Sequence, residues 1–462
     1  MTIKGDILVL GLGSSGMAAA TYLGENACRG ADVRVAVVDE ADTDVLRERA
    51  DKLRRLGEHV ELGAREVSGR FDLVVASPGI PPSDPLMVSA RALGVPVISE
   101  IELAYRESSS PWVAVTGTNG KTTVTSLIAH ILGECGIPAE PVGNIGPPAI
   151  ATATEVGRET VLVAEVSSFQ LAFTLEFHPR VAVLLNITPD HLDWHGSMEA
   201  YAADKAKVFD NLTADDVAVI DVDDAGSAPF AEQVAARGVR VVRVSRTTGH
   251  PGGATCIEGF LTIDAAEGPQ PLVATAELGI RGQHNMSNAL AGASAAHAMG
   301  APLSGIRAGL RSFKPIEHRL EPVEWVRGVE YFNDSKATNP DAVAKALTAF
   351  DGRPIVVLLG GHNKGNDFRA LAREVAATCR MAVLFGEARQ EFEAAFSGLD
   401  VPTRAVPTMM EAIRVAAESA REGDVVLLSP ACASFDEFTS YEHRGRVFKA
   451  RVLELARQAK ET

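Results

Sequence analysis

The chain has 462 residues, of which 46% are hydrophobic and 23% are charged. This balance excludes a disordered chain, and the length predicts about three domains with separate cores. The formal charge of −16 disfavours nucleic acid and other polyanions as partners. No apolar run is long enough to span a membrane, the first residues lead into a strand, and five widely spaced cysteines predict neither disulfides nor a zinc site. We therefore expect a cytoplasmic protein that does not associate with membranes.

The N-terminal segment predicts a strand at residues 6–10, the turn Gly11-Leu12-Gly13-Ser14-Ser15-Gly16, and a helix starting near Met17. A second strand at residues 33–38 ends in Asp39. This G-x-G-x-x-G spacing is typical of a Rossmann-like nucleotide site, with the diphosphate at the helix N-terminus and a ribose hydroxyl on the acidic residue. Three interpretations stay open here: a dinucleotide, another diphosphate-linked nucleoside, and a purely structural glycine turn.

A third strand at residues 71–76 ends in a loop that begins with Ser77. The polar turn at residues 107–111 places a domain boundary between about residues 97 and 111. We predict a first domain of residues 1–100, a second of residues 101–315 and a third of residues 316–462.

The second domain opens with a β-branched strand at residues 112–116, followed by the loop Gly117-Thr118-Asn119-Gly120-Lys121-Thr122-Thr123 and an apolar-periodic helix. Glycines allow backbone N–H groups to converge on a phosphate, Lys121 adds a full positive charge, and the Thr122 hydroxyl is placed to ligate magnesium. Val115 stands where the consensus loop has glycine. The alternative is a tight strand-to-helix turn with a surface lysine.

Two further apolar runs, residues 161–164 and 181–185, are expected to be buried parallel strands of the same sheet. Glu165 follows the first run directly, and His191 lies shortly after the second. Ligands bind beyond the carboxyl ends of such strands, so Glu165 and His191 are candidate metal ligands beside the phosphate loop. The alternative for each is a polar residue that only caps a strand end.

The helix after Ser197 has a lysine on its apolar face. That face is formed by Met198, Tyr201, Val208 and Phe209. Lys205 lies in the middle of it, whereas Lys207 projects to the opposite side. Burying an unpaired ammonium is costly, so Lys205 must extend to solvent, pair with an anion, lose its proton or be chemically altered.

The remainder of the chain predicts a strand-rich segment without chemistry at residues 212–275, then an alanine-rich helix entered through Asn285 and Asn288. Three apolar strands separated by helical segments then predict a third doubly wound unit. Loops at its strand ends carry Lys364 and Ser434, which are candidate carboxylate binders or ordinary solvated loop residues.

Together these motifs resemble the Mur ligase family, the ATP-dependent amide-forming enzymes of peptidoglycan precursor synthesis. The resemblance covers nearly the whole chain and rests on four segments: Thr116 to Thr123, Glu165 to Gln170, Glu317-His318-Arg319 and Asn333 to Asn339. The turn at Gly11, the loop at Ser77 and the segment Leu428 to Asp436 are similar to the family member that adds D-glutamate. The expected fold is α/β with three domains: a Rossmann-like N-terminal domain, a central P-loop ATPase-like domain with a parallel sheet, and a Rossmann-like C-terminal domain.

The resemblance also implies roles for individual residues. ATP would be bound by Gly117, Thr118, Asn119, Gly120, Lys121, Thr122, Thr123, Asn288, Arg319 and Asp334. The other substrates would be bound by Ser14, Ser15, Asp39, Ser77, Asn144, Ser167, Lys336, Thr338, Lys364, Ser434 and Phe435. Two magnesium ions would be held by Thr122, Glu165, His191 and Lys205, with Lys205 converted to a carbamate. Lys121, His191 and Lys205 would be the catalytic residues.

The implied reaction joins D-glutamate to UDP-N-acetylmuramoyl-L-alanine through an acyl phosphate, catalysed by a monomer. One departure from the pattern is Asn363, where many relatives have aspartate before the lysine. The rival hypotheses are a nucleotide-sensing binding protein without turnover, an NAD-dependent dehydrogenase, and a Mur-type ligase for another amino acid.

Overall fold

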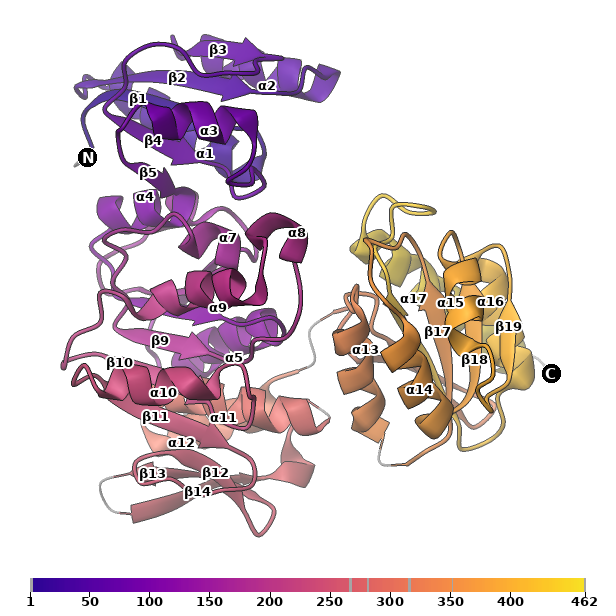
Figure 1. Cartoon of the computed structure of the whole chain (residues 1–462). Coiled ribbons are helices and arrows are strands. Elements are labelled where there is room, and N and C mark those ends of the chain that lie inside the picture. Colours follow the sequence, from indigo (N-terminus) through magenta and orange to yellow (C-terminus); the bar gives the residue numbers. More distant parts are fainter. Residues whose placement is uncertain (1–2, 266–267, 281, 315–316, 351, 461–462) are drawn as a thin grey trace. The chain divides into compact units, whose positions relative to one another are not determined.

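The computed structural model describes residues 3–265, 268–280, 282–314, 317–350 and 352–460. The chain divides into two compact units, Met1–Glu277 with Ser287–Ser312, and Leu278–Met286 with Phe313–Thr462. The first unit holds two sheets and the second holds one, each with helices packed on it (Figure 1). The predicted α/β class is therefore confirmed. The predicted domain limits stay predictions, and the limit between residues 315 and 316 lies outside the described residues.

The N-terminal sheet is fully parallel with strand order β3-β2-β1-β4-β5. Its elements are β1 (Gly5–Leu10), α1 (Ser14–Cys28), β2 (Val33–Asp39), α2 (Asp44–Arg54), β3 (His59–Leu62), β4 (Leu73–Ala76), α3 (Pro85–Ala92), β5 (Val97–Ser99) and α4 (Glu100–Glu107). The central strand β1 is flanked by β2 and β4. Ligands of such a sheet bind where the strand order reverses, beyond the carboxyl end of β1.

The central sheet has nine strands in the order β14-β13-β12-β11-β10-β9-β6-β8-β7. Its first part comprises β6 (Trp112–Thr116), α5 (Lys121–Glu134), β7 (Ala139–Gly143), α6 (Ala149–Ala153), β8 (Val161–Glu165), α7 (Ser168–Leu171), β9 (Val181–Leu184), α8 (Leu192–His195) and α9 (Met198–Ala206). It continues with β10 (Val217–Asp221), α10 (Ala228–Ala235), β11 (Arg240–Ser245), β12 (Ala254–Ile257), β13 (Phe260–Ala265), β14 (Gly268–Ala274), α11 (Gln283–Ala298) and α12 (Leu303–Ser312). Residues 212–275 are strand-rich as predicted. Strands β10 and β11 of this segment extend the parallel part of the central sheet.

The segment between the first two sheets is anchored by acidic side chains of α4. Glu102 is fully buried, and its carboxylate accepts backbone N–H bonds from Leu175, Glu176 and Phe177 at 2.9–3.0 Å. Glu100 accepts the N–H of Ile150 at 2.6 Å. Burial raises the pKa of Glu100 to about 7. Helix α4 is therefore fastened to the central sheet by its own carboxylates.

The second unit contains a six-stranded sheet with order β15-β16-β20-β17-β18-β19. Its elements are β15 (Glu321–Val326), β16 (Val329–Asn333), α13 (Pro340–Leu347), β17 (Ile355–Gly360), α14 (Arg369–Thr378), β18 (Cys379–Phe385), α15 (Arg389–Phe396), β19 (Thr403–Ala405), α16 (Met409–Ser419), β20 (Val425–Ala431) and α17 (Tyr441–Lys460). Only the β15–β16 pair is antiparallel. Strands β16, β17 and β20 end in the loops that carry the predicted amino-acid site.

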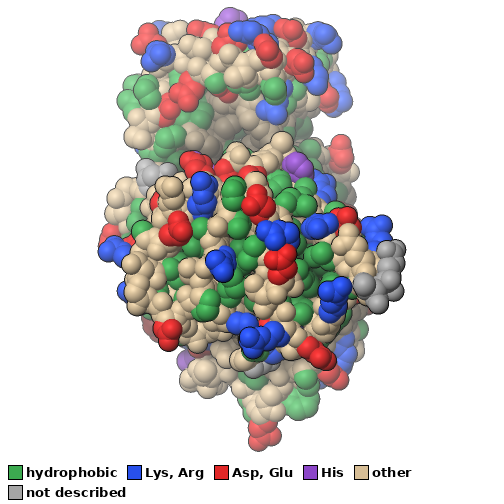
Figure 2. Space-filling model, turned by 90° about the vertical axis from the view of Figure 1, so that its right-hand side faces the viewer, with side chains coloured by type: hydrophobic (Ala, Val, Ile, Leu, Met, Phe, Trp, Pro, Cys, Tyr) green, Lys and Arg blue, Asp and Glu red, His purple; other side chains and the backbone are tan. Residues whose placement is uncertain are grey.

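Among the described residues, no helix is long and apolar enough to cross a bilayer. Figure 2 shows a face on which acidic and basic side chains are interspersed between apolar ones.

Candidate functional site

The first glycine turn connects β1 to α1 and leaves the helix N-terminus without a side-chain cap. Gly11 has a left-handed φ of 81°, and Gly13, the N-cap residue of α1, forms no side-chain cap bond. A Cβ on Gly16 would lie 1.9 Å from the Gly11 carbonyl oxygen, so only glycine fits there. Ser14 is exposed and Ser15 half-buried in the first helical turn. Uncapped N–H groups and the helix dipole make this turn suited to an anion.

Asp39 and Ser77 both hold this turn in place. Asp39 Oδ2 accepts the N–H of Leu12 at 2.6 Å, and Ser77 Oγ donates to the Gly11 carbonyl at 3.1 Å. The sequence did not indicate Arg49, whose Nη1 donates to the Leu12 carbonyl at 2.6 Å and brings a cation to the same turn. Asp39 Oδ1 accepts the N–H of Ala41 at 2.9 Å, so both carboxylate oxygens are engaged by the backbone.

The phosphate loop runs from β6 to α5, as predicted. Gly117 and Gly120 have φ angles of 150° and 87°, and Gly120, the N-cap of α5, forms no side-chain cap bond. The loop is braced from β9 by Asn186, whose side chain accepts the N–H of Asn119 and donates to its carbonyl. Thr118 Oγ1 lies 3.0 Å from the hydroxyl of Tyr201. These contacts fix the conformation of a loop whose glycines and helix N-terminus suit it to an anion.

Two lysine ammonium groups meet at one carbonyl oxygen of this loop. Lys121 Nζ donates to the carbonyls of Gly117 and Thr118, each at 2.9 Å, and Lys205 Nζ donates to the same Gly117 carbonyl at 2.9 Å. Lys205 is 2% exposed, so of the four outcomes considered for it, extension to solvent is excluded. Burial, and secondly the charge of Lys121, lower the pKa of Lys205 well below its ordinary value. Lys207, as predicted, lies on another side and donates to the Ala172 carbonyl.

Glu165 ends β8 at the same edge of the sheet and is 3% exposed. One carboxylate oxygen accepts the side-chain N–H of Asn144 at 3.0 Å, whereas Oε2 is buried without a hydrogen-bond partner among the described residues. A buried carboxylate oxygen with no donor is suited to a cation. Ser167 caps α7 in a capping box with Gln170, so its side chain is already engaged in ordering the loop after Glu165.

His191 is the N-cap residue of α8, with a left-handed φ of 53°, and its side chain is 44% exposed. Its ring packs edge-on against Phe169, with centroids 4.8 Å apart. A chain of polar side chains that the sequence did not indicate lies behind it: His195 is 2.9 Å from Ser168 Oγ and 2.9 Å from Asp204 Oδ2. The His195 side chain is fully buried. Because it contacts Ser168 of α7 and Asp204 of α9, it joins these two helices.

Asn288 of α11 also reaches the phosphate loop, since a Cβ on Gly120 would lie 2.6 Å from its side-chain oxygen. Thr122 and Thr123 are in the first turn of α5. Within the first unit, therefore, Lys121, Lys205 and Asn288 reach one loop. Arg319 and Asp334 belong to the second unit and are described there.

Asp334 follows β16 and is 7% exposed. Its two oxygens accept the N–H of Leu320 at 3.2 Å and the hydroxyl of Ser429 at 2.7 Å. Burial raises its pKa to about 7, opposed by these hydrogen bonds and by the charge of Arg319. Asp334 thus orders the turn that contains Arg319, a structural role that sequence motifs do not indicate.

The loops of the second unit hold the other predicted residues. Lys336 Nζ lies 4.0 Å from the ring centroid of Tyr441, a residue not indicated by the sequence. Thr338 is half-buried and Lys364 is exposed. Ser434 is 2% exposed, whereas the Phe435 ring is 69% exposed.

The unusual Asn363 has a structural reason. Its side chain donates to the Asn366 carbonyl at 3.1 Å and to Glu391 Oε2, and its oxygen accepts the N–H of Asn366. An aspartate at this position would face the Glu391 carboxylate with no donor to offer it. The Asn363 amide therefore stabilises the turn of the loop that carries Lys364, and it does so beside the Glu391 carboxylate.

Comparison with known proteins decides the family. Residues 5–99 match the family model "Mur ligase MurD-like, N-terminal domain", residues 115–296 match "Mur ligase middle domain", and residues 318–432 match "Mur ligase, glutamate ligase domain". The chain belongs to the Mur ligase family.

Its relatives are similar over their full length. A protein from Pelotomaculum thermopropionicum named UDP-N-acetylmuramoylalanine--D-glutamate ligase is 44% identical over 97% of both chains. One of the same name from Acidobacterium capsulatum is 41% identical over 98% of this chain and 97% of its own. Among solved structures, MurF from Acinetobacter baumannii gives a TM-score of 0.63 at 18% identity, covering 91% of this chain and 90% of its own. MurC from Thermotoga maritima gives 0.58 at 21% identity, covering 97% and 99%. These structures support the three-domain Mur ligase fold.

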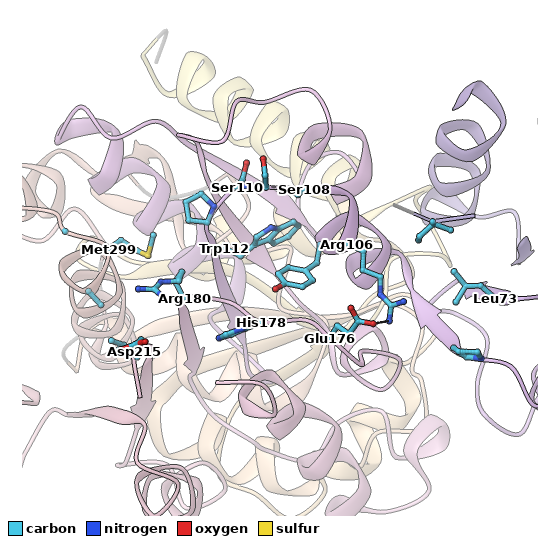
Figure 3. Close-up of a pocket in the computed structure, with 18 of the residues that line it drawn as sticks. Leu73, Arg106, Ser108, Ser110, Trp112, Glu176, His178, Arg180, Asp215 and Met299 are labelled. Carbon is cyan, nitrogen blue, oxygen red and sulfur yellow. Dashed lines mark hydrogen bonds and ion pairs between the residues drawn. The ribbon is translucent and has the colours of Figure 1, made fainter. Parts of the chain in front are cut away.

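This Mur ligase also has a cavity of about 1170 Å³ away from the predicted residues (Figure 3). It lies at the amino edge of the central sheet, where Trp112 starts β6, Arg180 precedes β9 and Asp215 precedes β10. The phosphate loop is at the opposite, carboxyl edge. None of the predicted site residues lines the cavity.

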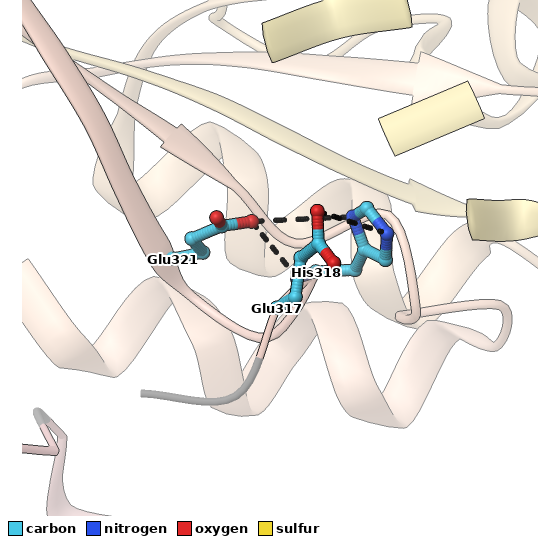
Figure 4. Close-up of side chains that lie close together, drawn as sticks. All are labelled: Glu317, His318 and Glu321. Carbon is cyan, nitrogen blue, oxygen red and sulfur yellow. Dashed lines mark hydrogen bonds and ion pairs between the residues drawn. The ribbon is translucent and has the colours of Figure 1, made fainter. Parts of the chain in front are cut away.

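The carboxylates Glu317 and Glu321 approach His318 closely enough for a metal site (Figure 4). Lys449, however, pairs with both carboxylates, at 2.9 Å and 2.5 Å. His318 Nδ1 lies 2.8 Å from the Asn333 side-chain nitrogen. The Lys449 ammonium group is therefore already shared between the two carboxylates and offsets part of their charge, and these contacts order residues 317–321.

Proposed function

We propose that this Mur ligase joins D-glutamate to UDP-N-acetylmuramoyl-L-alanine at the expense of ATP, through an acyl phosphate, in cytoplasmic peptidoglycan precursor synthesis. The observation that carries the proposal is the phosphate loop on which Lys121 and the buried Lys205 meet beside Glu165. The names of the relatives supply the two substrates, since those proteins are called UDP-N-acetylmuramoylalanine--D-glutamate ligases. The two rival functions explain less of the site. A dehydrogenase would not need a second phosphate-binding loop, and a nucleotide-sensing protein would not need a buried lysine beside that loop.

The N-terminal turn supports binding of the uridine diphosphate group. Its uncapped helix N-terminus would face a diphosphate, and Ser14 and Ser15 offer hydroxyls in the first turn of the helix, whereas the Ser77 hydroxyl donates to the Gly11 carbonyl. Asp39 has the place of a ribose ligand, although its oxygens also accept N–H bonds from Leu12 and Ala41. Arg49 adds positive charge to the same turn.

The chemistry begins at the terminal L-alanine carboxylate. Its oxygen attacks the γ-phosphorus of ATP, the bond to the β-phosphate oxygen breaks, and ADP leaves. Lys121 neutralises charge on the transferred group, and the N–H groups of residues 117–123 orient the phosphates, with Asn288 beside Gly120. Asn144 and Ser167 would hold the substrate. The D-glutamate amine then attacks the acyl carbon, phosphate leaves, and the amine loses a proton.

The residues present fit magnesium. Glu165 offers a buried carboxylate oxygen without a donor, and Thr122 offers a hydroxyl in the first turn of α5. These two residues would hold one ion. When bound, magnesium would offset the charge that phosphate and carboxylate groups bring together. His191 and Lys205 would hold a second ion, but an ammonium group does not fit a cation. Addition of carbon dioxide to the neutral amine, with loss of one proton, gives a carbamate whose oxygens do fit, and burial of Lys205 favours that neutral amine.

The second unit would bind D-glutamate. Lys336, Thr338, Lys364, Ser434 and Phe435 are on loops at the carboxyl ends of β16, β17 and β20. The two lysines offer charge to the two carboxylates, and the exposed Phe435 ring offers an apolar surface.

A panel of amino acids tests the function directly. The purified chain is incubated with ATP, magnesium, the uridine-linked substrate and one amino acid at a time, and ADP is measured. ADP release that requires both the uridine-linked substrate and D-glutamate is the expected result. Release with a different amino acid would assign another specificity, and no release with any would refute the ligase. Light scattering of the same sample tests the proposal that the enzyme is a monomer.

A further inference from the structure

Arg444, in the first turn of α17, is a fully buried cation outside the predicted site. Its exposed fraction is 0%. Among the described residues, no carboxylate forms an ion pair with it within 4.0 Å. Burial lowers its pKa to about 10, which still leaves it charged at neutral pH. A buried charge without a paired carboxylate must be stabilised by hydrogen bonds to neutral groups.

Those hydrogen bonds join two loops. Nε donates to Ser335 Oγ at 2.9 Å and Nη2 to the Ser335 carbonyl at 2.8 Å. Nη1 donates to the carbonyls of Cys432 and Ala433 at 3.1 Å and 3.2 Å. Ser335 follows β16, and Cys432 follows β20, so one planar guanidinium spans the ends of neighbouring strands.

Each of these loops carries predicted amino-acid ligands directly after the contact. Lys336 follows Ser335, and Ser434 follows Ala433. The loop after β17, which carries Lys364, is joined to the loop after β20 by backbone hydrogen bonds. His362 and Ala433 exchange two N–H to carbonyl bonds of 2.9 Å and 3.0 Å. The α17 residue Tyr441 further supports Lys336 through its ring and accepts the Ser335 hydroxyl at its carbonyl.

The space around Arg444 tolerates little change. A Cβ on Gly361 would lie 2.2 Å from the Ala433 carbonyl oxygen and 3.1 Å from Arg444 Nη1. Lysine at position 444 would keep the charge but place its donors on a single nitrogen, which cannot reproduce the fixed fork of a guanidinium. The distance between the two loops therefore depends on the shape of the arginine head group and not only on its charge.

We propose that Arg444 is a positioning residue for the acceptor amino acid. It sets the separation between the loop bearing Lys336 and Thr338 and the loop bearing Ser434 and Phe435. Arg444 itself is buried and contacts neither substrate. The inference rests on the proposed function, because it assigns these loops to D-glutamate.

The test compares Arg444→Lys, Arg444→Met and Arg444→Ala in the full chain with Arg446→Met, an exposed arginine of the same helix. Steady-state kinetics give KM for each substrate. Hydroxylamine in place of the amino acid traps the acyl phosphate as a hydroxamate, with release of phosphate. The amount of hydroxamate therefore measures formation of the acyl phosphate and does not depend on binding of D-glutamate. We expect KM for D-glutamate to rise at least tenfold in the three Arg444 variants, with hydroxamate formation within about twofold of wild type. Arg446→Met should leave both unchanged.

Methylguanidinium provides a readout that a general loss of packing would not give. It should lower KM for D-glutamate in Arg444→Ala by restoring the fork in the vacated space, while tetramethylammonium at the same concentration should not. Equal KM increases for all three substrates, or a normal KM for D-glutamate in folded Arg444→Met, would overturn the proposal. If wild type forms neither ADP nor hydroxamate, the ligase assignment itself fails, and the wild-type control separates that outcome from failure at Arg444.

Discussion

Replacing Glu58 with glutamine should stabilise the N-terminal sheet, and increasingly so as pH rises. Glu58 precedes β3, is 7% exposed, and packs on Gly24 of α1, where a Cβ would lie 1.9 Å from its Oε1. Neither carboxylate oxygen has a hydrogen-bond partner among the described residues. Burial raises the pKa of Glu58 to about 8.

The sign follows from proton binding. Because the folded pKa is above the ordinary value of 4.5, the folded protein holds a proton that the unfolded chain releases between these two values. Stability from the neutral carboxyl is therefore complete below about pH 4.5 and is lost as pH rises toward 8. The difference of about 3.5 pKa units corresponds to a limit of about 5 kcal/mol. Between about pH 5.5 and pH 8.5 the advantage of Glu58→Gln should grow by about 3 kcal/mol.

Hydrogen exchange of amides in β1 and β2 measures the opening free energy of this sheet separately from the others. Glu61→Gln, an exposed change in β3, is the matched control and should show no such growth. An advantage of Glu58→Gln that stays constant between the two pH values would refute the argument, because it would mean that Glu58 is ionised, or neutral, throughout.

The remaining predictions concern the proposed reaction. Lys205→Ala should lose at least 100-fold in kcat, whereas Lys207→Ala should lose little. Wild-type activity should fall when carbon dioxide is removed and return with bicarbonate. A larger loss of kcat in Lys207→Ala than in Lys205→Ala would disprove the carbamate. Lys121→Ala should remain folded but form no hydroxamate with hydroxylamine, since the loop charge that stabilises phosphoryl transfer is gone. Lys364→Ala should raise KM for D-glutamate about tenfold or more with little change for ATP, as kinetics with each substrate varied will show. Calorimetric titration should detect the uridine-linked substrate and not NAD; binding of NAD alone would contradict the assignment of the first glycine turn.

Sequence patterns predicted what depends on local chemistry. The glycine turns at Gly11 and Gly117 were located because close backbone approach and left-handed φ angles leave few alternatives to glycine. Lys205 was singled out because a charged residue interrupts an apolar face at helical spacing, a conflict visible without coordinates. The α/β class followed from buried apolar runs that alternate with helical segments.

Contacts between distant segments could not be predicted in this way. Asn186, Arg49 and Arg444 are polar residues in ordinary local surroundings, and only the fold brings them to the loops they support. Helix α4 was missed because its short amphipathic stretch follows β5 without a break, inside the segment in which a domain boundary was predicted. Strand β3 has four residues and one buried apolar side chain, too little for a periodic signal.

The anchoring of α4 determines where the chain can be cut. Three successive N–H groups at residues 175–177 depend on the Glu102 carboxylate, and Ile150 depends on Glu100. A fragment that begins near residue 110 would remove the buried carboxylates that accept these N–H groups, including the N–H of the buried Phe177. A fragment that begins at Ser99 keeps the helix, its N-cap and all of these acceptors. Separate expression of the nucleotide-binding sheets should therefore keep residues 100–107 with the second piece.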